Sequence, residues 1–160
     1  MGTGYSHPIR AYRVCMEING LPLHPLVVHA AVVFGPLGAL LALAYVSLPS
    51  RRDQLRWPML GLVVVAGLSI LAAYLTGRYF LTQRPELKQL PGVSTHRARA
   101  RVLLAVTSAF TLVGVATAWL HTRTGVVRVL LLTLLGLSAA GTLVMVVLTG
   151  DAGARAVWGQ

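Results

Sequence analysis

The chain has 160 residues, of which 56% are hydrophobic and 11% charged, and its 14 Lys and Arg residues outnumber 4 acidic residues. This composition is too apolar and too poor in charge for a soluble domain of this length, so we predict an integral membrane protein. The basic residues flank apolar runs and form no soluble basic face with interleaved aromatics. This pattern excludes nucleic acid as a partner and indicates contact with the headgroups of a lipid bilayer.

Four charge-free runs match the roughly 20 residues that a helix needs to cross a bilayer. Backbone groups must be hydrogen-bonded internally in lipid, so each run is expected to form a helix. The first run lies too far from Met1 and is too long for a usual cleaved signal peptide. We expect an N-terminal extramembrane segment over 1–25, one transmembrane domain over 26–150 and a C-terminal tail over 151–160. The expected spans are 26–48, 58–77, 102–120 and 129–149.

The connections between spans predict the fold class. Residues 49–57, "PSRRDQLRW", and residues 121–125, "HTRTG", are short, so sequential spans should be antiparallel neighbours. We therefore predict an all-α, up-down four-helix bundle with both termini on the same side. Face A denotes the end that carries the termini and the loop 78–101. Face B denotes the end that carries the two short connections.

Histidines gather at face A in this arrangement. His24, His29 and His96 fall there, whereas His121 stands alone at face B. Each pair of spans begins near a histidine, His29 and then His96, and ends in Leu-Thr-Gly, over 75–77 and 148–150. The two hairpins therefore look like a degenerate repeat about an axis along the membrane normal.

Helical angles indicate which side chains face the bundle interior. In the first span the stripe Ala31, Gly35, Gly38 and Ala42 projects back through His24, while His29 lies about 140° from His24. Small residues line the contacts between membrane helices, so this stripe is expected to face inward. In the third span one stripe holds His96, Ala100, Thr107, Thr111, Gly114, Ala118 and His121.

Four motifs carry a resemblance to a known family. They are "LPLHPLVVHAAVV", with His24-Pro25-x-x-x-His29, the Leu-Thr-Gly at the end of the second span, His96, and the Gly-rich "TGDAGARAVWG". From residue 20 onward the chain resembles the prokaryotic four-helix membrane family known as domain of unknown function 2231. It departs at Ala30, where relatives usually have Phe-Pro, and at Asp151, where a Gly-His-Leu-Gly-Gly type of run is more usual. The resemblance implies a multi-pass protein of a prokaryotic plasma membrane. Some relatives are joined to Rieske-type domains, which implies an iron-sulfur or cytochrome redox partner or a larger respiratory complex.

Two neutral imidazoles from facing helices can ligate a b-type haem inside a helical bundle. We predict a single haem near face A with His29 and His96 as axial ligands and His24 as the alternative ligand. Arg97, Arg99 and Arg101 lie at the same face and could pair with the haem propionates. This site would serve electron transfer, so we expect an electron carrier or accessory subunit rather than an enzyme and predict no catalytic residue.

Two other interpretations stay open. His24, His29, His96 and Asp151 together have the donors for a Zn or Cu site. A cofactor-free accessory subunit would instead pack its helices against larger membrane partners. His121, which precedes "TRTG", is interpreted as an interfacial anchor.

Overall fold

The computed structural model describes residues 17–18 and 21–158. A two-stranded antiparallel ribbon, which pairs Glu17 with Pro22 and Ile18 with Leu21, precedes the helices. The elements in chain order are β1 (Glu17–Ile18), β2 (Leu21–Pro22), α2 (Leu23–Ser47), the 3-10 turn η1 (Pro49–Arg51), α3 (Arg52–Gln83), the 3-10 turn η2 (Pro85–Gln89), α4 (Pro91–Trp119) and α5 (Gly125–Trp158).

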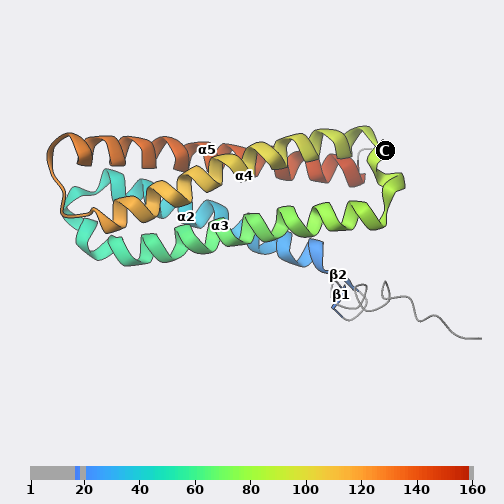
Figure 1. The fold of residues 1–160 in the computed structure, drawn as a ribbon, viewed down its shortest axis with the longest axis horizontal. Coiled ribbons are helices and arrows are strands. Elements are labelled where there is room, and N and C mark those ends of the chain that lie inside the picture. Colours follow the sequence, from blue (N-terminus) through green and yellow to red (C-terminus); the bar gives the residue numbers. More distant parts are fainter. Residues whose placement is uncertain (1–16, 19–20, 159–160) are drawn as a thin grey trace, which may run out of the picture.

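The long helices run alternately up and down, and α2 begins at the end of the bundle where α5 finishes (Figure 1). Each helix packs on two neighbours, in the closed order α2, α3, α4, α5 and back to α2. The predicted all-α, up-down bundle is confirmed for the part of the chain that the structure describes. Its two hairpins, α2 with α3 and α4 with α5, make the most extensive contacts.

All four helices are long and apolar enough to cross a membrane. Their outer surfaces carry large apolar side chains, among them Leu112, Val126 and Leu137, each more than two thirds exposed. Exposed apolar surface on this scale suits lipid rather than water. At face A the helices continue beyond the predicted spans, and residues 151–158, predicted as a tail, belong to α5.

Local chemistry explains where these helices begin. Pro49 and Pro91 occupy first helical positions, where the missing N–H costs no hydrogen bond. Gly125 begins α5 with φ +67°, a left-handed conformation that favours glycine. The tight turn before α5 therefore brings the helix straight back along α4.

The predicted small-residue stripe of α2 is confirmed, because Ala31, Gly35, Gly38 and Ala42 are all buried. A larger apolar core, which includes Tyr45, Met59, Phe110 and Leu135, fills the middle of the bundle and its face B end. Toward face A a smaller layer takes one residue from each helix: Ala31, Ile70, Leu103 and Val146. This layer is the last apolar level of the core before the polar end of the bundle.

Candidate functional site

Beyond the apolar layer, each helix contributes one polar side chain at about one to two turns closer to face A. These residues are His24 of α2, Thr76 of α3, His96 of α4 and Thr149 of α5, and we call them the histidine layer. Thr76 and Thr149 are buried, and both histidines are partly buried. A polar layer of this kind at the end of a membrane bundle is a candidate site, because burying polar groups there is costly.

His24 is held against α3. Its Nδ1 lies 3.1 Å from the Thr76 hydroxyl oxygen, and that hydroxyl already donates to the Ala72 carbonyl at 2.8 Å. With the Thr76 hydroxyl donating to Ala72, it accepts from the ring, and in that tautomer Nδ1 carries the proton and Nε2 keeps its lone pair. The ring stacks on Phe80 with centroids 6.3 Å apart and lies over Gly77, where a Cβ would come within 2.9 Å of Cε1.

His96 is held against α5 in the same way. Its Nδ1 lies 3.1 Å from the Thr149 carbonyl oxygen, which can only accept, so the proton is on Nδ1, and Nε2 has no hydrogen-bond partner in the part of the chain that the structure describes. A Cβ at Gly153 would lie 3.2 Å from both Cε1 and Nδ1 of this ring. Both imidazoles thus turn the same edge toward a glycine of the partner helix within their own hairpin.

The histidine layer follows the repeat of the two hairpins. The sequence comparison of the hairpins paired His29 with His96, whereas the structure places His24 in the position equivalent to His96. The Thr149 hydroxyl is buried and has no hydrogen-bond partner among the described residues, so the layer holds one unused polar group.

Residues 20–160 match the family described as predicted membrane protein (DUF2231). The chain belongs to this family. The resemblance drawn from the sequence is thereby confirmed, and it agrees with the four candidate membrane spans. Comparison with curated proteins and with solved structures gave no match.

The other predicted site residues of this DUF2231 protein lie apart from the histidine layer. His29 is exposed on the outer side of α2, and its Nδ1 lies 2.6 Å from the Pro25 carbonyl oxygen. Arg97 and Arg101 are exposed on α4. The structure therefore places His24 and His96 in one layer at the face A end of the bundle, and it places His29 on the outside.

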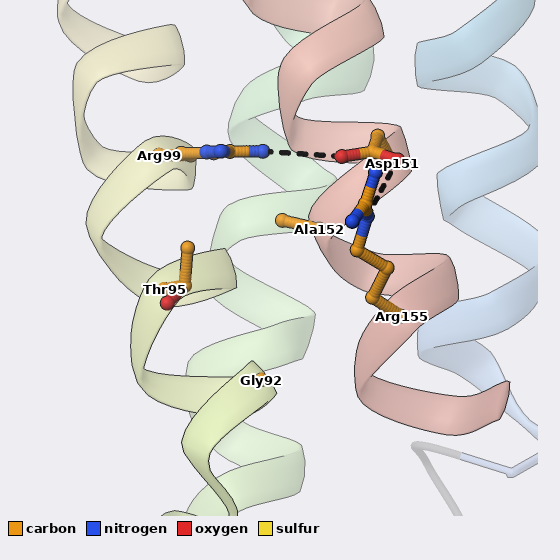
Figure 2. Close-up of a pocket in the computed structure, with 6 residues that line it drawn as sticks. All are labelled: Gly92, Thr95, Arg99, Asp151, Ala152 and Arg155. Atoms are coloured by element: carbon orange, nitrogen blue, oxygen red, sulfur yellow. Dashed lines mark hydrogen bonds and ion pairs between the residues drawn. The ribbon is translucent and has the colours of Figure 1, made fainter. Parts of the chain in front are cut away.

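Arg99 and Asp151 belong to a polar cluster between α4 and α5. Arg99 donates from one terminal nitrogen to the Leu148 carbonyl at 2.7 Å and to Asp151 at 3.4 Å, and Arg155 donates to the other Asp151 oxygen at 2.9 Å. Figure 2 shows both guanidinium groups directed at this one carboxylate. Asp151 is thus engaged by two arginines, and neither oxygen is left without a partner.

At face B the DUF2231 bundle holds a hydrogen-bonded chain that the sequence analysis missed. The Tyr45 hydroxyl lies 2.7 Å from His121 Nδ1, and His121 Nε2 lies 2.5 Å from the Asp53 carboxylate. With Nε2 protonated, His121 donates to Asp53 and accepts from Tyr45. The sequence indicated that Tyr45 faces the bundle interior, because Tyr45 continues the α2 stripe of Gly38 and Ala42 at helical spacing. Tyr45 is only 2% exposed, so its phenol is out of reach of a substrate in water.

Proposed function

We propose that this membrane protein holds a single b-type haem at face A, with His24 and His96 as axial ligands, and serves electron transfer in or beside a respiratory complex of the plasma membrane. The observation that carries the proposal is that the two imidazoles have the same hydrogen-bonding arrangement. They come from different hairpins and lie at one level of the bundle. Each Nδ1 lies 3.1 Å from an oxygen, and neither Nε2 has a hydrogen-bond partner among the described residues.

The hydrogen bonds of the two rings follow the pattern found in histidines that ligate metals. A ligating histidine almost always donates its second ring N–H to a carbonyl or another acceptor, which fixes the tautomer and the ring orientation. Thr76 and Thr149 provide these acceptors. The His24 and His96 side chains are therefore preset to bind through Nε2 with little further ordering.

The number of donors favours haem over zinc or copper. No group of three or more His, Cys, Asp or Glu side chains that could hold a metal ion occurs among the described residues. A zinc site needs three or four protein ligands, whereas a haem iron takes four ligands from its own macrocycle and needs only axial ones. Two imidazoles meet that smaller requirement. A haem bound there would supply one-electron transfer.

The surroundings of the layer offer one further polar group. The Thr149 hydroxyl is buried and has no hydrogen-bond partner among the described residues, whereas the space above Gly77 and Gly153 is filled by the two imidazoles. Among the predicted propionate partners, Arg97 and Arg101 are exposed, whereas Arg99 is already bound to Leu148 and Asp151. Only Arg97 and Arg101 therefore remain as candidate propionate partners, and both lie outside the histidine layer.

A second candidate is a cofactor-free accessory subunit. The observation that favours it is the fit of each imidazole into the space above a glycine, over Gly77 and over Gly153. In this interpretation both rings only fill the contacts within the hairpins, and larger membrane partners cover the outside of the bundle.

Absorption spectra of four alanine variants separate the candidates. We expect protein purified from haem-replete cells to show the Soret and α-bands of a six-coordinate, low-spin b haem. His24→Ala and His96→Ala should each lose the haem or leave it high-spin, because each removes an axial ligand. His29→Ala and His121→Ala are matched controls and should keep the spectrum, since one ring is outside the bundle and the other is at face B.

Three results would contradict the proposal. Loss of the spectrum in His29→Ala with His24 dispensable would restore the pair predicted from the sequence. A protein that stays colourless after haem supplementation, and contains no zinc or copper, would support the accessory subunit. Stoichiometric zinc or copper in the colourless protein would support a metal site.

A further inference from the structure

A shallow pocket of about 240 Å³ opens between α4 and α5 at face A. Its wall on α4 is formed by Gly92, Thr95 and Arg99, and its wall on α5 by Asp151, Ala152 and Arg155. Figure 2 shows the Arg99–Asp151–Arg155 cluster lying across this pocket. None of these residues belongs to the histidine layer.

The charges of the pocket suit a monoanion. Asp151 neutralises one of the two guanidinium groups, which leaves a net charge of one positive unit. Arg155 uses its Nε–H on Asp151, and its two terminal nitrogens have no hydrogen-bond partner among the described residues. Arg99 is fixed from one terminal nitrogen by the Leu148 carbonyl and Asp151, which leaves its other donors available. Planar guanidinium groups bind phosphate oxygens through short, charge-assisted hydrogen bonds.

The position of the pocket favours a lipid as the source of the phosphate. Asp151 and Arg99 lie near the face A ends of two candidate membrane spans, where headgroups are found. About one turn closer to the membrane centre, the exposed side chains include the apolar Val102 on α4, and Val147 and Leu148 on α5. If the phosphate of a lipid lies in the pocket, the acyl chains of that lipid would therefore lie along an apolar surface.

We propose that this pocket binds the phosphodiester group of an anionic phospholipid, with Arg155 and Arg99 as donors to the phosphate oxygens. Asp151 acts as a positioning residue that orients both guanidinium groups. Thr95, exposed on the wall of α4, provides a hydroxyl donor on the opposite side. This inference is independent of haem binding, since it uses none of the residues of the histidine layer.

Native mass spectrometry of the delipidated, full-length protein in detergent tests the proposal. Titrations with phosphatidylglycerol, phosphatidylcholine and inorganic phosphate compare an anionic phosphodiester, a zwitterionic one and the free ion. We expect saturable binding of phosphatidylglycerol in preference to phosphatidylcholine. Arg155→Gln should weaken phosphatidylglycerol binding about tenfold, the loss of one charge-assisted contact. Arg99→Gln should weaken it as well, with thermal unfolding used to check that this variant is folded.

Arg123→Gln is the matched control, because it removes the same charge from an exposed position at face B. It should leave the affinity for phosphatidylglycerol unchanged. Equal weakening by Arg123→Gln and Arg155→Gln would reduce the effect to general surface charge and overturn the proposal. Equal affinity for the two lipids, or an unchanged affinity in Arg155→Gln, would overturn it too. Phosphate binding that depends on Arg155 without any preference for phosphatidylglycerol would assign the pocket to the free ion.

Discussion

At the scale of single residues, the buried phenol of Tyr45 joins three segments at face B. Its hydroxyl meets His121 in the turn between α4 and α5, and His121 reaches Asp53 in the first turn of α3. Arg52 donates to the Tyr45 and Val46 carbonyls near the end of α2, at 3.1 and 2.8 Å. These bonds satisfy carbonyls that a helix end leaves without partners. Face B is therefore a closed, hydrogen-bonded end.

We predict that Tyr45→Phe destabilises the bundle by about 1–2 kcal/mol, because it removes a buried hydrogen bond and leaves His121 Nδ1 unpaired. Thermal or denaturant unfolding in detergent measures the change. Tyr74→Phe is the matched control, since the partly exposed Tyr74 contacts Arg78 through its ring and its hydroxyl has no hydrogen bond among the described residues. Equal stability of the two variants would show that the Tyr45 bond contributes nothing.

The histidines show how much of the site could be predicted from the sequence at the scale of residues. Helical angles place His24 on the inward stripe and His29 away from it, and the structure agrees. The prediction of His29 as a ligand followed its depth in the span instead. Which histidine each of Thr76 and Thr149 contacts could not be predicted, because this depends on how each hairpin is aligned, and sequence periodicity gives a rotation but no alignment between helices.

At the scale of elements, α2 and α3 approach each other through Gly38. A Cβ there would lie 3.0 Å from the Leu62 carbonyl oxygen and 3.2 Å from Ala66 Cβ. The first of these atoms belongs to the backbone of a neighbouring helix and cannot move away alone. Close backbone approach of this kind is how membrane helices gain packing energy without a hydrophobic driving force.

We therefore predict that Gly38→Ala lowers stability by roughly 1–3 kcal/mol, the usual cost of overpacking a tight contact. Gly61→Ala on α3 should be neutral or slightly stabilising, because nothing lies within 4 Å of its Cβ position and alanine favours the helix. Unfolding of both variants in the same detergent makes the comparison. If the two substitutions behave alike, the packing of α2 against α3 through Gly38 is wrong.

The extents of the helices were only partly predictable. Apolar length shows that a span exists, because the bilayer core requires it. It does not show where the helix ends, since backbone hydrogen bonds continue past the membrane boundary whatever the hydropathy of the residues. Hence α3 runs to Gln83, and α5 runs through the residues expected as a tail.

At the scale of the whole molecule, the two hairpins are alike at face A and differ at face B. At face A each hairpin holds one imidazole against a glycine and a threonine of its second helix. At face B the hydrogen-bonded chain joins α2 and α3 to the turn between α4 and α5. Hydrogen bonds thus connect the two hairpins at face B, while the polar groups that could bind a ligand lie at face A.

The difference between face A and face B requires that all face A residues lie in one compartment. Single-cysteine labelling tests this requirement. In a Cys15→Ser background, Lys88→Cys and Ala154→Cys report face A, while Ser50→Cys and Thr122→Cys report face B; all four positions are exposed. With a membrane-impermeant maleimide on sealed vesicles, we expect the two face A positions to react together and the two face B positions to behave oppositely, because successive helices alternate in direction. The pair that reacts also gives the orientation of the protein. Lys88 and Ala154 in opposite compartments would require an odd number of crossings between them and would contradict the bundle.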